Sequence, residues 1–235
     1  MKPVTVVIPS YKKPEQVEKC KEALDKQTYD HVKPFIWDNN THNIGFTKAM
    51  NKGLKLAAYS EGDYVILLNQ DCYLKPDAIT KMVEFMEKHP KCAIGGIKQI
   101  SDKNPDYIVH GGCQEAFPNG VHKVGSIEAG NCSENEQMPW VNGACLIVRL
   151  EAVLDIGLMD ENYFLICSDS DWCYTARARN WEVWYIADAE CIHEQGISNK
   201  PTPEFEQIMV DDMIYFKDKW CESGLFRELH LEIFE

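Results

Sequence analysis

The stretch Tyr64-Val65-Ile66-Leu67-Leu68-Asn69-Gln70-Asp71 combines a short apolar run with a polar end. The apolar run is typical of a central strand that is covered on both faces of a sheet. Lys75-Pro76-Asp77 follows and breaks the strand before a helical pattern begins. Asp71 is therefore expected just past the carboxyl end of a parallel strand, where open α/β sheets bind ligands. A solvated turn aspartate is the alternative, and this stretch alone does not decide between the two.

Strands and helices alternate along the first part of the chain. The strand-like runs are Val4 to Ile8, Phe35 to Trp37, Tyr64 to Leu68 and Cys92 to Ile97. Apolar residues at helical spacing mark Pro14 to Gln27, Phe46 to Ala57 and Ile79 to Met86. This order predicts an α/β fold with a parallel sheet and right-handed crossovers. Its carboxyl edge would gather Pro9-Ser10-Tyr11, Asp38-Asn39-Asn40 and Asn69-Gln70-Asp71 into one crevice.

The pattern is looser after Lys98. Asp102 to Gln137 is rich in Gly, Asn and Pro, which predicts long loops and a β-hairpin. Further on, we expect strands at 144–148 and 182–186, and helices at 151–156, 171–178 and about 203–220. No repeat or obvious linker divides the chain, so a single domain in two lobes is the simplest organisation.

Charge and cysteine content narrow the class of protein. The formal net charge of −13 argues against binding a nucleic-acid backbone or an anionic lipid surface. The apolar stretch near the N-terminus is too short for a signal-peptide core, and no C-x-x-C pair occurs among the 10 cysteines. His110, Cys113, His122 and Cys132 could be drawn as a zinc site, but their spacing is irregular. We expect a reduced cytoplasmic protein without a transmembrane segment, so any membrane association would be peripheral.

Five features could carry chemistry. Asp38 offers a carboxylate that accepts hydrogen bonds, and Gly45 allows close backbone approach at the start of a helix, which favours anions. Asp71 could ligate a hard divalent cation. Asp169 and its neighbour Asp171 come at the start of a later helix, and a neutral His193 imidazole could be a metal ligand.

Each feature also has a structural explanation. Asp38 could begin a turn, Asn43 could cap a helix, and Ser168 or Asp169 could be the N-cap of the helix that follows. His193 could be an ordinary loop histidine. Trp140 is most economically a core residue, although it precedes a glycine turn and could stack on a ligand.

In their order along the chain, these features resemble inverting family 2 glycosyltransferases with the GT-A fold, in particular the rhamnosyltransferase-like branch. The matching stretches are Val6 to Tyr11, Trp37 to Asn40, Asn43 to Gly53, Leu68 to Asp71, Trp140 to Ala144 with Arg149, Gly157 to Phe164, Asp169 to Cys173 with Arg177, and His193 to Gly196.

The resemblance implies a role for each matching residue. Its nucleotide-binding residues would be Pro9, Tyr11, Asp38, Asn43, Gly45, Lys48 and Asn69. Asp71 matches the last aspartate of the family's D-x-D motif, which holds Mn²⁺ or Mg²⁺ against the diphosphate, and His193 matches a metal or phosphate ligand. Asp169 matches the catalytic base, whereas Ser168 replaces the glutamate that precedes it in the family. Asp171 and Trp140 would then bind the acceptor or support the site.

The implied fold is a mostly parallel central sheet flanked by helices, with a small antiparallel lobe on the acceptor side. One GT-A domain would span 1–235, with a nucleotide-binding half at 1–98, a metal and acceptor half at 99–200 and a helical extension at 201–235. The implied reaction moves a sugar from a UDP or dTDP donor to a hydroxyl of a glycan or lipid-linked acceptor, with inversion. Two alternatives stay open: a non-catalytic relative that binds glycan or nucleotide, and a sugar-nucleotide pyrophosphorylase. The oligomeric state is undetermined.

Overall fold

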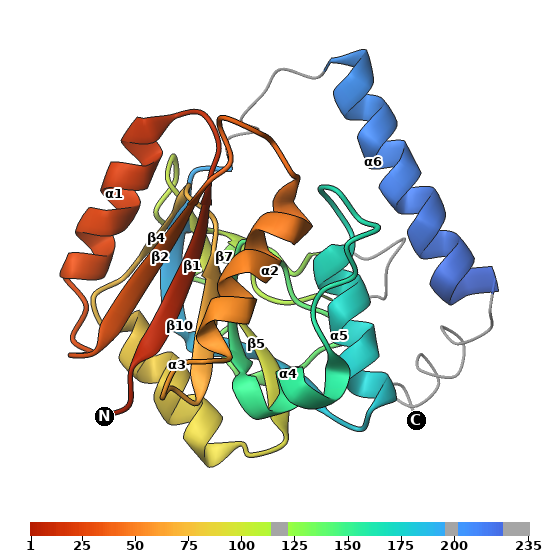
Figure 1. The fold of residues 1–235 in the computed structure, drawn as a ribbon. Coiled ribbons are helices and arrows are strands. Elements are labelled where there is room, and N and C mark those ends of the chain that lie inside the picture. The colour runs from red at the N-terminus through yellow and green to blue at the C-terminus, as the bar shows by residue number, and fades with distance from the viewer. Residues whose placement is uncertain (114–121, 196–201, 223–235) are drawn as a thin grey trace.

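The computed structural model describes residues 1–113, 122–195 and 202–222 (Figure 1). The strands are β1 Val4–Ser10, β2 Val32–Asp38, β3 Tyr64–Leu68, β4 Cys72–Leu74, β5 Cys92–Ser101, β6 Tyr107–His110, β7 Gly125–Ser126, β8 Glu136–Gln137, β9 Cys145–Arg149 and β10 Glu182–His193. The helices are α1 Pro14–Asp25, α2 Phe46–Ala57, α3 Ala78–Lys88, α4 Leu150–Ile156, α5 Ser168–Ala178 and α6 Pro203–Phe216, followed by the π-helical segment η1 Lys217–Glu222.

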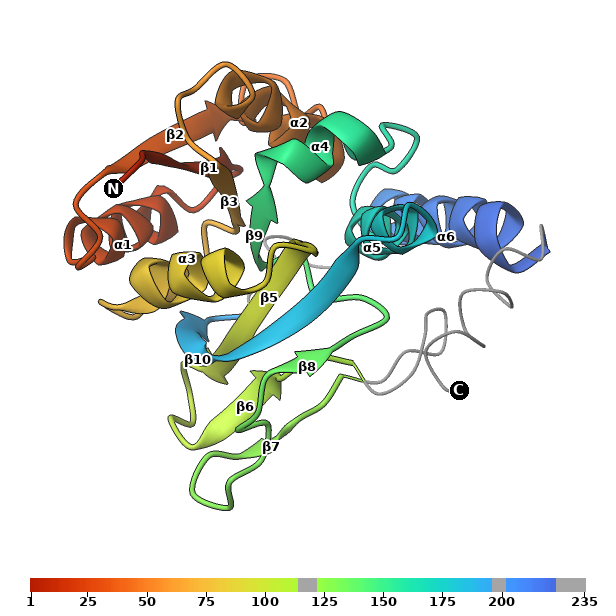
Figure 2. The ribbon, with the colours of Figure 1, turned by 90° about the horizontal axis from the view of Figure 1, so that it is seen from below.

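One sheet lies between two layers of helices (Figures 1 and 2). Alternate side chains of the central strands point to opposite faces. Val6 and Ile8 of β1 belong to the core that includes α1 and α3, whereas Val7 belongs to the core that includes α2, α4 and α5. β3 is buried on both faces, which explains why its sequence is apolar throughout.

The sheet order is β2-β1-β3-β9-β5-β10-β4. β1 pairs in parallel with both β2 and β3, as expected. β3 and β5 are not neighbours, however, because β9 lies between them and is antiparallel to both. β6, β7 and β8 form a small antiparallel group at one end, visible at the bottom of Figure 2. The expected central sheet flanked by helices, with a small antiparallel lobe, is therefore confirmed. The sheet is mixed and not mostly parallel, because β9 enters between β3 and β5 antiparallel to both.

Several elements differ in length from the expectation. β10 continues to His193 instead of ending at Ile186, because its second half pairs with both β5 and the short strand β4. α5 begins at Ser168, three residues earlier than expected, and Cys167 before it has a left-handed backbone (φ 66°). The extension of β10 matters for the site, since it carries His193 to the carboxyl edge of the sheet.

Two expectations about the class of protein can be compared with the structure. The nine cysteines whose side chains are described are all free thiols, as expected for a reduced protein. Within the three described ranges, no helix combines the length and the apolar character that crossing a bilayer requires.

Candidate active site

A pocket of about 400 Å³ lies at the carboxyl edge of β1, β2 and β3. It is lined by Pro9, Tyr11, Asn39, Asn43, Gly45, Phe46, Asn69, Gln70, Asp71, Phe164, Leu165, Thr202, Glu204, Phe205 and Ile208. The structure thus brings together six of the residues that the sequence nominated, at the edge where open α/β sheets bind ligands. A cavity of about 800 Å³ at the opposite edge, around Lys2 and Glu87, contains none of them.

Asparagines shape the wall of this pocket next to α2. The Asn39 Oδ1 atom accepts a hydrogen bond from the Ile44 N–H (2.9 Å), and the Asn43 Oδ1 atom accepts one from the Gly45 N–H (3.0 Å). Gly45 has a φ of 86°, and a Cβ atom there would lie 2.6 Å from the carbonyl oxygen of Phe164. A glycine is therefore required at this position. Asn39 was absent from the nominated set, although its place directly after Asp38 was a signal for it.

Two of the nominated nucleotide-binding residues lie outside the pocket lining. The Asp38 Oδ1 atom accepts hydrogen bonds from the backbone N–H (2.9 Å) and the side chain (2.7 Å) of Asn40, which closes a turn. These bonds, the backbone one first, lower the pKa of the exposed Asp38 carboxyl. Lys48 is exposed on α2. Asp38 therefore begins a turn in this structure, which is the structural explanation given for it above. Contact of Asp38 or Lys48 with a nucleotide stays a prediction.

The end of β3 is tied to the end of β1 by Gln70. Its Oε1 atom accepts a hydrogen bond from the Tyr11 N–H (2.8 Å), and its Nε2 group donates to the Tyr11 carbonyl (2.9 Å). These bonds hold Tyr11 and the loop from Asn69 to Asp71 against each other. Sequence reasoning gave Gln70 no role of its own.

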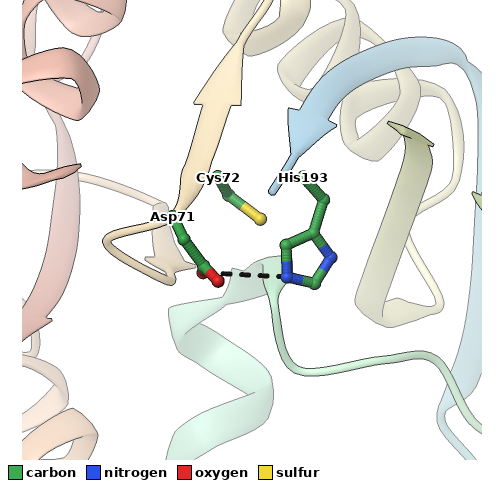
Figure 3. Close-up of side chains that lie close together, drawn as sticks. All are labelled: Asp71, Cys72 and His193. Carbon is green, nitrogen blue, oxygen red and sulfur yellow. Dashed lines mark ion pairs between the residues drawn. The ribbon is translucent and has the colours of Figure 1, made fainter. Parts of the chain in front are cut away.

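Asp71, Cys72 and His193 bring their side chains together, with potential ligand atoms within 4.8 Å of one another (Figure 3). Antiparallel pairing of β4 with β10 sets His193 opposite Cys72. The Asp71 Oδ1 atom lies 3.7 Å from the His193 Nε2 atom. Burial lowers the pKa of His193, although Asp71 opposes this effect, so the imidazole is neutral near pH 7.

Cys72 is the member of this group to which sequence reasoning gave no role in a site. Burial raises the pKa of its thiol well above the ordinary value. Hard divalent ions prefer oxygen and nitrogen donors to sulfur, which favours the Asp71 carboxylate and the neutral His193 imidazole as ligands. An oxygen and a nitrogen donor of this kind fit a divalent ion such as Mn²⁺.

Asp169 lies in the first turn of α5. Its Oδ2 atom accepts a hydrogen bond from the Gly143 N–H (2.7 Å), and its Oδ1 atom accepts one from the Ser170 N–H (2.9 Å). Burial raises the pKa of the Asp169 carboxyl, although these backbone bonds oppose the shift. A carboxylate held in place with an elevated pKa can accept a proton, which is what a general base must do.

Asp171 points elsewhere and is 2% exposed. It accepts hydrogen bonds from the Tyr163 hydroxyl (3.1 Å) and the Trp220 indole N–H (2.7 Å), and it pairs with Lys219 (2.7 Å). Burial raises the pKa of its carboxyl, and Lys219 opposes this shift. Its carboxylate is enclosed and fastens η1 to α5, which favours the supporting role over contact with the acceptor among the two expected for Asp171.

Trp140 and the histidines lie near Asp169. Trp140 is 5% exposed and packs edge-to-face on His122, with ring centroids 5.4 Å apart, which favours the core explanation. Contact of Trp140 with the acceptor stays a prediction. The Nδ1 atoms of His110 and His122 are 2.7 Å apart. Over the described parts of the chain, the group around Asp71 is the one cluster suited to a metal, which leaves the zinc alternative unsupported.

The first two turns of α6, the helix expected from about residue 203, line the pocket through Glu204, Phe205 and Ile208. Asp212 holds the helix in place. Its carboxylate accepts hydrogen bonds from three consecutive backbone N–H groups, those of Phe164 (2.8 Å), Leu165 (2.7 Å) and Ile166 (2.8 Å). Residues from both ends of the described chain therefore enclose one pocket.

A family model described as "Glycosyl transferase family 2" matches residues 35–155, slightly more than half of the chain. The chain belongs to glycosyl transferase family 2. Its curated relatives place it in the rhamnosyltransferase-like branch. It is 25% identical over 185 residues to the N-acetylglucosaminyl-diphospho-decaprenol L-rhamnosyltransferase of Mycobacterium tuberculosis, which covers 68% of this chain and 59% of the relative. It is 23% identical over 154 residues to the dTDP-rhamnosyl transferase RfbF of Shigella flexneri, and the match covers 66% of this chain and 50% of that relative.

The chain thus spans between half and three-fifths of the length of these two relatives. Solved glycosyltransferases share the fold of this family 2 member. GalNAc-T7, crystallised with UDP, GalNAc and Mn²⁺, superposes with a TM-score of 0.64 at 14% identity, covering 89% of this chain and 48% of that one. TarS of S. aureus superposes with a TM-score of 0.56 at 16% identity, and the match covers 88% of this chain and 38% of TarS. The predicted GT-A fold and family are both confirmed.

Proposed function

We propose that this protein transfers a sugar from a UDP or dTDP donor to a hydroxyl group of a glycan or lipid-linked acceptor, with inversion and with the aid of a divalent metal ion. The observation that carries the proposal is the pairing of Asp71, which lines the pocket, with His193, while Asp169 on α5 has different partners, the N–H groups of Gly143 and Ser170. Two carboxylates with different partners suit direct displacement, in which one group stabilises the leaving diphosphate and another takes up a proton.

On the donor side, Pro9 and Tyr11 of the pocket would contact the nucleoside, with Asn43 and Gly45 beside it. The relatives named for dTDP-rhamnosyl and decaprenol-linked rhamnosyl transfer support a dTDP-sugar and a lipid-linked saccharide. The solved relative with UDP and Mn²⁺ supports a nucleoside diphosphate bound with a metal. The nucleotide-binding half at 1–98 would therefore need α6 from the 201–235 extension to complete its pocket.

On the metal side, Asp71 and His193 would hold the ion, with Asn69 contributing to diphosphate binding. When bound there, Mn²⁺ supplies Lewis acidity toward the departing diphosphate. The nitrogen donor favours Mn²⁺ over Mg²⁺, because Mg²⁺ prefers oxygen ligands throughout.

On the acceptor side, Asp169 would take the proton of the attacking hydroxyl group. Each of its oxygens accepts one backbone N–H bond, so a further lone pair remains on each for that proton. Attack from the side opposite the diphosphate inverts the anomeric carbon. General-base catalysis of this kind is worth about 10²- to 10⁴-fold in rate.

A thermal-shift panel tests the donor and the metal together. UDP, dTDP, GDP, CDP and ADP would be added with and without Mn²⁺ to wild type, to Asp71→Asn and to the control Asp77→Asn, which changes a half-exposed aspartate paired with Lys81. A ligand at ~100 times its Kd adds about 2.7 kcal/mol, or roughly 5–10 °C for a chain of this size. We expect one pyrimidine nucleotide to give this shift only with Mn²⁺ and only when Asp71 is present.

The outcome for the reaction itself is read from the product. Its anomeric configuration, measured by NMR, should be opposite to that of the donor, and retention would contradict the assignment of Asp169 as a base. Binding of a nucleotide by wild type without any turnover would instead favour the non-catalytic alternative.

A further inference from the structure

We propose that Gln99 and Asn142 are positioning residues that hold His193 in the tautomer whose Nε2 lone pair faces Asp71. The inference deepens the proposed function, because it concerns the metal side of the same site. Gln99 is fully buried on β5, next to β10, and its side chain connects His193 to Asn142. Neither residue would touch the substrate, so their effect would act through His193.

The argument begins at a backbone N–H group, which can only donate. The N–H of Ala144 donates to the Oδ1 atom of Asn142 (2.9 Å), so the amide of Asn142 must turn its oxygen to this point. The same oxygen faces Gln99 at 3.1 Å. Gln99 must therefore present its Nε2 group there, because two carbonyl oxygens would repel each other.

The orientation of the Gln99 amide then decides the proton on His193. With its Nε2 group directed to Asn142, Gln99 turns its Oε1 atom to the His193 Nδ1 atom, 2.8 Å away. A carbonyl oxygen only accepts, so Nδ1 carries the proton of the neutral ring. The Nε2 atom is left with its lone pair, and it is this atom that lies 3.7 Å from Asp71. The other tautomer would direct an N–H group at the metal side and could not ligate.

The turn at Asn142 to Ala144 also holds the other parts of the site. The Gly143 N–H donates to Asp169 (2.7 Å), and the Ala144 carbonyl accepts from the Asn69 N–H (2.8 Å). A variant that distorted this turn would disturb the base as well as the metal side. The test therefore compares side-chain changes that keep or remove one acceptor oxygen and leave the backbone residues in place.

Long-range ¹H–¹⁵N correlation spectra of the ¹⁵N-histidine-labelled chain report the tautomer of each ring, with His193→Asn providing the assignment. At mildly alkaline pH, we expect wild type to carry the His193 proton on Nδ1. Asn142→Asp keeps an acceptor for both donors and should retain this spectrum. Asn142→Leu and Gln99→Met remove the constraint and should shift the ring toward the mixture of tautomers in free imidazole. A proton on Nε2 in wild type, or an unchanged ring in Gln99→Met, would overturn the proposal.

Titration with Mn²⁺ alone, followed by the electron paramagnetic resonance signal of the free ion, gives a second readout. Loss of an outer hydrogen bond to a ligand histidine lowers metal affinity about 10- to 100-fold, which we expect for Gln99→Met and not for Asn142→Asp. Equal Mn²⁺ affinity of wild type and Gln99→Met would refute the positioning role. A wild type with the Nδ1 proton that binds no Mn²⁺ would uphold the tautomer assignment and contradict the metal site of the proposed function.

Discussion

Replacement of Asp212 by Asn should loosen α6 from the loop before α5. The carboxylate of Asp212 is 3% exposed and accepts three backbone hydrogen bonds, one at Oδ1 and two at Oδ2. An asparagine has one oxygen, which can keep the two bonds from Leu165 and Ile166. Its NH₂ group would then face the N–H of Phe164, donor against donor.

The cost follows from these contacts. One buried N–H group loses its partner, at about 1–3 kcal/mol, and two remaining bonds lose the assistance of a charge, at roughly 0.5–1 kcal/mol each. We therefore expect the opening of α6 to become easier by about 2–5 kcal/mol. Since about 1.4 kcal/mol is tenfold in an equilibrium constant, the protection of α6 amides should fall about 30- to 4,000-fold.

Hydrogen exchange over Pro203–Phe216 measures this change, with Asp211→Asn as the control. Asp211 is the neighbouring residue, exposed and bonded within the helix to Gln207 (2.8 Å), so its replacement should leave exchange nearly unchanged. Nucleotide-induced stabilisation should also weaken in Asp212→Asn, because α6 carries Phe205 and Ile208 of the pocket wall. Equal exchange in the two variants would refute the anchoring role of Asp212.

Three further results are expected. Gly53→Ala places a Cβ atom 2.2 Å from a methyl carbon of the buried Val7. The free energy of unfolding, measured in urea, should fall by about 1–3 kcal/mol and recover when Val7→Ala is added. Burial lowers the pKa of both His110 and His122. Below about pH 6.5 the unfolded chain therefore binds more protons than the folded chain, and the free energy of unfolding should decrease as the pH falls. If a His110→Gln/His122→Gln variant kept this pH dependence, the pair would be excluded as its source. Burial raises the pKa of Asp169, so the acid limb of kcat should lie above the ordinary aspartate range of about 3.9, and a limb within that range would contradict the role of base.

The sequence predicted best those elements whose period and composition are local. β1 is rich in β-branched residues, β3 is an uninterrupted apolar run, and α2 has the bounds that its spacing of apolar residues predicted. Because parallel strands meet at one edge, the ends of these strands also predicted the place of the pocket, where Tyr11 and Asp71 are found together.

Non-local contacts could not be predicted in the same way. Nothing in the sequence of β9 indicates that it pairs antiparallel between β3 and β5. Asp171 and Asp169 are two residues apart in one helix, yet they point to different surroundings, and only the position of η1 reveals which is enclosed. Asp212 directly follows Asp211 in an acidic helix, so nothing in the local sequence distinguishes it as the residue that bonds to a distant loop. The site was thus predictable as a location, and the roles of individual carboxylates were not.

The position of β9 has a consequence for synthesis of the chain on the ribosome. β3 is apolar throughout, and its free side stays open until β9 emerges roughly 80 residues later, about 4–16 s at ordinary elongation rates of 5–20 residues per second. During that interval the nascent β1–β2–β3 sheet presents an unpaired apolar edge, which is the kind of surface that recruits other strands. We expect this interval to be the period of greatest aggregation risk, and chaperone occupancy on nascent chains should decline once Cys145–Arg149 has left the exit tunnel.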